Sequence, residues 1–134
     1  MDPSTSFDKT IDLLSRAFAE LESELADLSM KQIIYLETIA RLGKPTFSEL
    51  AKRLGVTRSS VTGIITKLIQ KGYVQKIQSS DDRRSFNILL TEKGQGLSEM
   101  HKNLHHKIAE LISRNLSERE LSQLAVLLDK IVKG

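Results

Sequence analysis

Hydroxyl-bearing and basic side chains gather on one face of a helix predicted to begin at Arg58. They lie opposite the apolar positions of the same helix, so we expect them to face solvent or a partner. Short hydrogen-bonding groups and cations suit the base edges of a DNA major groove and the phosphates beside it. Singly, each residue fits an ordinary exposed helix position, but together they favour DNA contact. The predicted contacts are Arg58, Ser59, Ser60, Thr62, Gly63, Thr66 and Lys67.

Gly63 is the unusual member of this set. A glycine inside a helix costs about 1 kcal/mol of stability relative to alanine. Its place among the polar residues therefore indicates a close approach of DNA. Hydroxyl residues also open the two helices of this region, and the start of a helix favours an anion. We expect Thr46, Ser48 and Thr57 to lie near phosphates.

A second polar cluster, residues 79–84, separates two segments with strand character. An arginine fits a narrow minor groove, where the negative potential is enhanced. A neighbouring aspartate can hold the guanidinium in an extended pose. Asp82, Arg83 and Arg84 are therefore predicted to contact DNA from the tip of a hairpin. The alternative interpretation is a solvated hairpin tip.

The histidines offer a possible metal site. His101 and His105 are four residues apart on a predicted helix and could share one zinc ion, with Glu22, Glu24 or Glu37 completing the site if the helices meet. However, His101 falls in the apolar seam of its helix, where a hydrogen-bonded histidine is commoner. We therefore expect no bound zinc and no other cofactor.

Cysteine is absent from the 134 residues. This excludes disulfides, thiolate-ligated metals, a thiol nucleophile and a thiol redox sensor. The sequence shows no nucleophile–base pair and no phosphate-binding glycine loop, so an enzyme is not expected. Aromatic residues make up only 4% of the chain, which argues against a stacking platform for single-stranded nucleic acid.

Positive charge is concentrated in the middle of the chain. The formal net charge is +3, but residues 44–94 alone hold ten Lys or Arg and four acids, a net of +6. The flanks carry a net of −4 over residues 1–43 and +1 over residues 95–134. A basic centre between such ends is typical of a domain that binds a polyanion. A solvated basic face is the alternative.

The pattern of the basic centre is helix, tight turn, helix and hairpin. Apolar periodicity and capping residues predict helices over 29–42, 47–54 and 58–71, and alternation predicts strands over 74–78 and 85–90. Gly55 supplies the sharp turn between two of the helices. Capping boxes are expected at Ser29 with Gln32, Thr46 with Glu49, and Ser117 with Glu120.

Apolar seams on the flanking helices point to packing against another helix. The first seam recurs in alternating steps of four and three, at Phe7, Ile11, Leu14, Phe18, Leu21, Leu25 and Leu28. After a helix over 92–114, the last helix carries a similar seam at Leu121, Leu124, Leu128 and Ile131. A partner subunit and the chain's own core are both possible neighbours. The predicted dimer interface is Phe7, Ile11, Leu14, Leu121, Leu124, Leu128 and Ile131.

These elements predict a single domain that is mainly α with a small β-wing, an α+β fold. The winged helix-turn-helix lobe is expected over residues 29–91, with helical dimerisation regions at 1–28 and 92–134. The N-terminus lacks the basic and apolar regions of a signal peptide, and no apolar run could span a membrane. A cytoplasmic protein is expected.

Several stretches together resemble the MarR family of transcriptional regulators, over essentially the whole chain. The helix-turn-helix match is carried by Ser48–Ala51, Gly55–Thr62 and Leu68–Val74, and the wing match by Asp82–Arg84 with the exit Leu90–Gly94. The wing resembles the family's Asp-x-Arg pattern, and the exit resembles its Leu-Thr-x-x-Gly pattern. Each stretch alone is weak, whereas the combination is specific.

The resemblance implies a homodimer formed by the terminal helices, with recognition helices in successive major grooves. It implies that Arg84 reaches the minor groove, braced by Asp82. A repressor of an inverted-repeat operator of double-stranded DNA, released by a small-molecule ligand, is expected. The ligand cleft would lie between the dimer helices and the DNA-binding lobe, with Phe18, Tyr35 and His101 as candidates. The runner-up is a winged helix that binds protein.

Overall fold

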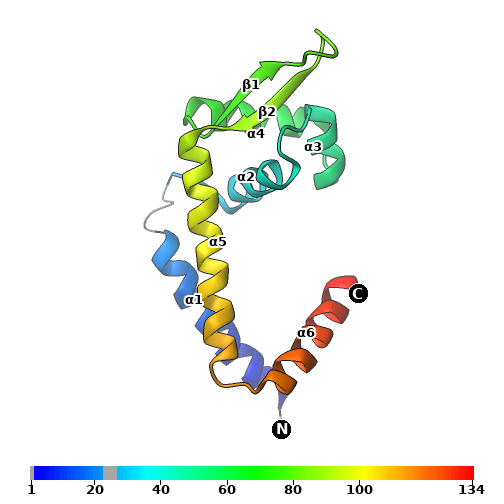
Figure 1. Ribbon diagram of the computed structural model, residues 1–134. Helices are drawn as coiled ribbons and strands as arrows, with labels where there is room; N and C mark the ends of the chain where they lie inside the picture. The colour runs from blue at the N-terminus through cyan, green and yellow to red at the C-terminus, as the bar shows by residue number, and fades with distance from the viewer. Residues whose placement is uncertain (1, 23–26) are drawn as a thin grey trace. The chain divides into compact units, whose positions relative to one another are not determined.

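The structure is a computed structural model that describes residues 2–22 and 27–134, apart from the side chains of residues 20–22. It divides into two units, Ser23–His101 and Met1–Glu22 with Lys102–Gly134. The described helices are α1 (Pro3–Glu22), α2 (Met30–Leu42), α3 (Phe47–Leu54), α4 (Arg58–Gln70), α5 (Glu92–Ser113) and α6 (Glu118–Lys133). The strands are β1 (Val74–Gln78) and β2 (Phe86–Leu90). The predicted fold class, mainly α with a small β-wing, is confirmed (Figure 1).

The seam predicted to reach Leu28 in the first helix was wrong at its end. Leu28 lies outside any helix, because the next residue, Ser29, is extended and caps α2. Leu25 and Glu24 lie outside the described residues, and the side chains of Leu21 and Glu22 are not described. At the other end α1 begins earlier than its seam, at Pro3, where proline suits the first helical position and Asp2 accepts the backbone N–H of Ser4 at 3.0 Å.

The core of the unit Ser23–His101 is formed by one face of each helix and by the hairpin. Apolar residues at helical spacing on α2 and α4 turn inward, and β2 contributes Ile88. Burying each such side chain stabilises the fold by about 1.5–3 kcal/mol. The residues exposed by 1% or less are Leu36, Ile39, Leu50, Val61, Ile65, Leu68 and Ile88.

Gly55 makes the turn between α3 and α4 in the left-handed conformation, with φ 67° and ψ 34°. This conformation is costly for residues with a Cβ atom. The buried Ala51 and Leu50 bring α3 against the core, and the N–H of Val56 donates to the carbonyl of Ala51 at 3.1 Å. The predicted glycine turn is therefore confirmed.

Two of the three expected capping boxes are complete. Ser29 with Gln32 and Ser117 with Glu120 each form both reciprocal hydrogen bonds. At the third site Thr46 accepts the N–H of Glu49 at 3.1 Å, but the Glu49 carboxylate accepts the Thr46 hydroxyl at 3.2 Å instead of a backbone N–H. Thr46 also forms an isolated β-bridge with Asn87.

The two strands form an antiparallel hairpin, the wing, whose register pairs Val74 with Leu90 and Gln78 with Phe86. Its loop lies at the free end, away from helices α2–α4 (Figure 1). The strand β2 is tied near its middle to the connection between α2 and α3. The N–H of Ile88 donates to the carbonyl of Pro45 at 2.8 Å, and the Asn87 amide donates to the carbonyl of Lys44 at 2.6 Å. The wing is thus anchored through β2 on the same lobe as α4.

The unit formed by α1, α6 and the end of α5 exposes large apolar side chains. No residue of α6 is buried, and its exposed apolar residues include Leu121, Leu127, Leu128, Ile131 and Val132. On α1, Phe7 is 64% exposed and Ile11 is 58% exposed. Apolar surface of this extent marks a site of interaction. Among the described residues, no helix is long and apolar enough to cross a membrane.

Gly94 lies so close to the α4–β1 corner that an added Cβ atom would overlap the carbonyl oxygen of Tyr73. Because backbone cannot rotate away as a side chain can, we expect Gly94→Ala to lower the free energy of unfolding by roughly 1–3 kcal/mol. Urea unfolding followed by circular dichroism measures this change.

Gly96 is the matched control, because it lies in the same helix and a Cβ there meets nothing within 4 Å. Gly96→Ala should raise the free energy of unfolding by about 0.5–1 kcal/mol. Equal effects of the two substitutions would contradict the close approach at Gly94.

Candidate nucleic-acid interface

The face of α4 opposite the core carries every residue predicted to contact bases. Val61, Ile65 and Leu68 are buried, which fixes the rotation of the helix about its axis. The positions on the other side are then solvent-exposed: Arg58, Ser59, Ser60, Thr62, Gly63, Thr66 and Lys67. The structure therefore brings the predicted set together on one surface, and its contact with DNA stays a prediction.

Several hydroxyl groups on this face already donate hydrogen bonds within the helix. Thr62 donates to the carbonyl of Arg58 at 3.0 Å, and Thr66 donates to the carbonyl of Thr62 at 2.7 Å. Each threonine then presents its methyl group and remaining acceptor capacity outward. The side-chain donors left on this face include Arg58, Ser59 and Lys67, a division of roles that the sequence did not reveal.

The residues at the two helix starts are largely occupied by capping. Thr57 accepts the N–H of Ser60 at 3.1 Å, and the two hydroxyls lie 2.9 Å apart. Thr46 caps α3 in the same way, while Ser48 is exposed in its first turn. The positive ends of both helices remain at the lobe surface, where they favour an anion such as a phosphate. Their contact with phosphates stays a prediction.

The wing tip holds its shape through backbone contacts. The Asp82 carboxylate accepts the backbone N–H of Arg84 at 2.9 Å, and the Gln78 amide donates to the carbonyl of Arg83 at 2.7 Å. Within the described residues neither arginine forms an ion pair, and both are exposed. Asp82 thus braces Arg84 through its backbone, as aspartate commonly does two residues on in a turn, and not through the guanidinium.

Lys76 adds a cation to the wing that the sequence analysis did not single out. Its Nζ lies 5.0 Å from the centroid of the Phe86 ring. Lys76 and Ile88 are paired across the strands, and Phe86 faces the same side as Ile88. Sequence alone could have found this pair only from the hairpin register. A cation held over a ring keeps its charge at the surface of the wing.

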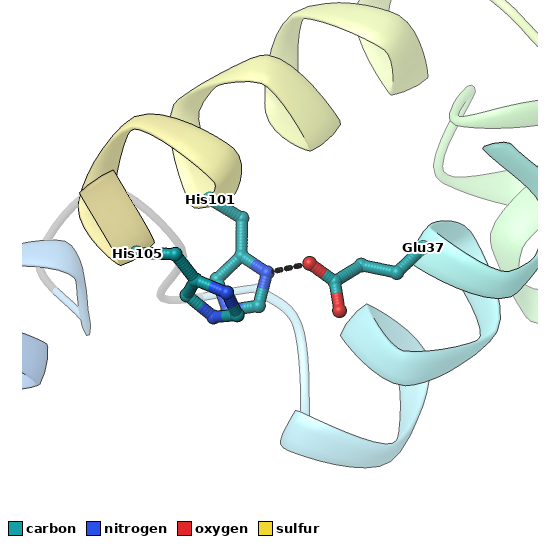
Figure 2. Close-up of side chains that lie close together, drawn as sticks. All are labelled: Glu37, His101 and His105. Carbon is teal, nitrogen blue, oxygen red and sulfur yellow. Dashed lines mark hydrogen bonds and ion pairs between the residues drawn. The ribbon is translucent and has the colours of Figure 1, made fainter. Parts of the chain in front are cut away.

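His101 is a buried, hydrogen-bonded histidine, in agreement with the interpretation preferred from its place in an apolar seam. It is 6% exposed, and its Nδ1 contacts the Glu37 carboxylate on α2 (Figure 2). His105 follows one turn later on α5, so helix geometry places the two rings on one side. Within the unit Ser23–His101, Glu37 and His101 offer a carboxylate and an imidazole, ligand types that suit a metal ion.

The residues predicted for an effector cleft are divided between the two units. Tyr35 and His101 are buried in the unit Ser23–His101, and Phe18 is half-buried on α1 of the other. The Tyr35 hydroxyl is buried without a hydrogen-bond partner in the described structure, and burial raises its pKa. An orphaned buried hydroxyl is rare and calls for an explanation. The cleft itself stays a prediction.

The unit of α1 and the end of α5 also contains a hollow of about 190 Å³. Leucine and alanine side chains form much of its lining, and Arg16 and Lys107 add positive charge. None of the residues predicted for the effector cleft lines it.

Comparison with known proteins shows which family has a similar sequence and fold. The model of the MarR family matches residues 28–86. The HTH-type transcriptional regulator PecS of Dickeya dadantii is 30% identical over 124 residues, which cover 90% of this chain and 74% of that protein. An uncharacterised HTH-type regulator of Bacillus subtilis, YfiV, is 31% identical over 67% of this chain, which spans only 54% of that relative's length.

The fold is also similar to that of FabT from Streptococcus pneumoniae, solved in complex with DNA. The two chains superpose with a TM-score of 0.81 at 26% identity, over 98% of this chain and 96% of that chain. Members of the matched family are transcription regulators and not enzymes. The chain belongs to the MarR family of winged helix-turn-helix transcriptional regulators.

Proposed function

We propose that this protein is a homodimeric repressor that binds an inverted-repeat operator of double-stranded DNA and is released by a small-molecule effector. The observation that supports DNA binding best is the shared surface of α4, whose polar and basic residues are all exposed opposite a buried apolar face. The exposed arginines of the wing belong to the same lobe. That region carries a net charge of +6 over residues 44–94, which suits a polyanion.

The apolar surfaces of α1 and α6 support the homodimer. Leu128 is 48% exposed and Ile131 is 71% exposed, although both belong to a seam with helix-packing periodicity. A two-fold dimer would place two recognition helices about 34 Å apart, the length of one DNA turn, which is the spacing that an inverted repeat requires. The proposed interface keeps Phe7, Ile11 and Leu14 on α1 with Leu121, Leu124, Leu128 and Ile131 on α6.

For the effector we retain Phe18, Tyr35 and His101 as candidate contacts. The unpartnered hydroxyl of Tyr35 supports a ligand that offers a hydrogen-bonding atom next to α2. Because the neighbouring core residues are apolar, we expect the rest of the ligand to be apolar.

Arg84→Ala should weaken operator binding and make it less sensitive to salt. Loss of one phosphate-neutralising side chain reduces the slope of log affinity against log salt by about one. Fluorescence anisotropy with a labelled operator duplex at several salt concentrations measures both quantities. Arg119→Ala on α6 makes the same charge change outside the DNA-binding lobe and should alter neither. Unchanged binding by the Arg84 variant would remove the wing from the interface.

Gly63→Ala should separate stability from DNA affinity. A Cβ at this position meets nothing within 4 Å, so the free protein should gain about 0.5–1 kcal/mol of unfolding free energy. If DNA approaches this face closely, the added methyl group lowers affinity. Gly96→Ala, also helical and open, should raise stability without changing affinity. Equal or tighter DNA binding by the Gly63 variant would place this residue away from DNA.

Leu128→Glu tests the dimer. A carboxylate in the apolar seam of α6 should convert the protein to monomers in light scattering, because burying an unpaired charge is costly. Operator affinity should then fall about tenfold or more, since the two half-sites are no longer read by one linked particle. Ser122→Glu, on the other side of α6, is the control and should leave the dimer intact. A dimeric Leu128→Glu protein would refute this interface.

A further inference from the structure

Residues 71–73 form the corner at which the recognition helix α4 becomes the wing. Lys71 caps the helix, Gly72 turns with φ +83°, and Tyr73 precedes strand β1. Both surfaces proposed to contact DNA therefore depend on how this corner is held. Tyr73 is 5% exposed, so the corner is also part of the core.

The segment that leads into α2 holds one side of the corner. The Tyr73 hydroxyl donates to the Asp27 carboxylate, at 3.0 Å to Oδ1 and 3.2 Å to Oδ2. The Lys71 ammonium donates to the backbone carbonyl of Asp27 and lies 3.4 Å from Oε1 of Gln32. The same Gln32 oxygen accepts the N–H of Ser29 in the capping box of α2. The corner is thereby fastened to the start of α2.

The segment that leads into α5 holds the other side. The Thr91 hydroxyl donates to the carbonyl of Gly72 at 2.6 Å, and the Thr91 N–H donates to the carbonyl of Tyr73 at 3.0 Å. The Lys93 ammonium donates to the carbonyl of Lys71 at 2.8 Å and lies 4.3 Å from the centroid of the Tyr73 ring. The corner is therefore held between the two segments through which the chain enters and leaves the lobe.

These contacts differ in kind. On the α5 side, the hydrogen bonds are accepted by backbone carbonyl groups of the corner. On the α2 side, one side-chain bond joins a hydroxyl to an ionised carboxylate 46 residues away. A hydrogen bond to a charged acceptor is stronger than a neutral one. Burial raises the pKa of Tyr73, and the hydrogen bond and charge of Asp27 raise it further, which keeps the hydroxyl a donor.

We propose that Asp27 and Tyr73 are positioning residues for DNA recognition, whose hydrogen bond sets the direction of the recognition helix relative to the wing. The inference rests on the proposed DNA-binding function, although neither residue belongs to the predicted DNA-contacting set. Any change that withdraws Asp27 releases the α4–β1 corner and lowers operator affinity.

The first test compares two variants of the DNA-binding lobe that each lose one hydroxyl. Tyr73→Phe should raise the operator Kd about fivefold or more, within the range of typical coupling between sites. Thr38→Val is the matched control, because the hydroxyl it removes donates within α2, to the carbonyl of Ile34 at 2.8 Å, and belongs to no proposed contact set; it should leave the Kd within about twofold. Circular dichroism confirms that both variants are folded under the binding conditions.

The second test asks whether the two residues act through one bond. Asp27→Ala should weaken binding as Tyr73→Phe does, and the double variant should be no weaker than either single variant. Asp27→Asn, whose amide oxygen still accepts a hydrogen bond, should retain part of the affinity. In every variant the salt slope should equal that of the wild type, because no phosphate contact is removed.

A third measurement does not involve DNA. The chain has two tyrosines, so the absorbance titration of Tyr35→Phe reports Tyr73 alone. Adding Asp27→Asn should lower the pKa of Tyr73, because the carboxylate that opposes formation of the phenolate is gone. An unchanged titration would mean that the bond does not form in solution, and the proposal would fail.

The binding outcomes distinguish the proposed DNA-binding function from the positioning role of Asp27 and Tyr73. If the wild type binds no duplex at low salt, the proposed function is wrong and the positioning role falls with it. If the wild type binds and folded Tyr73→Phe binds equally well, only the positioning role is refuted. A change in salt slope, or an equal loss in Thr38→Val, would also refute it, since those results indicate a lost phosphate contact or general damage to the lobe.

Discussion

Burial of three side chains on α4 determines what the DNA-binding lobe presents to its surroundings. Val61, Ile65 and Leu68 are at most 1% exposed, and a helix turns by a fixed angle at each residue. Once these positions point inward, Arg58, Thr62 and their neighbours must point outward. The wing is fixed to the same core by Ile88, whose side chain is fully buried. One set of apolar contacts therefore orients both surfaces.

The other unit, formed by α1, α6 and the end of α5, leaves apolar side chains uncovered. The seams of α1 and α6 have the spacing of helices that pack, yet α6 buries none of its residues. Exposed leucine and isoleucine side chains in water forfeit the stabilisation that burial would supply. A second copy, as we propose, offers an identical surface to cover them, and a two-fold arrangement is the simplest closed solution. Dimerisation and folding would then draw on the same apolar surface.

Local signals in the sequence predicted the elements well, because they act over a few residues. Thr57, Gly55 and the alternation in β2 placed their segments correctly, and the buried face of α4 followed from its periodicity. The features that the sequence did not predict depend on competing hydrogen bonds or on residues that are far apart in the chain. Glu49 did not complete its capping box, since its carboxylate accepts the Thr46 hydroxyl instead of the backbone N–H of Thr46. The bond between Tyr73 and Asp27 has no local signature.

The stretch Leu90–Gly94 shows how long-range packing can nevertheless leave a recognisable motif. Thr91 caps α5 by accepting the N–H of Gly94 and donates its hydroxyl to the carbonyl of Gly72. A Cβ at Gly94 would overlap the carbonyl oxygen of Tyr73, so only glycine fits without a shift of backbone. A hydroxyl and a glycine three residues apart are thus both required by the corner of α4 and β1. The pattern in the sequence records the approach of two segments that are about 20 residues apart.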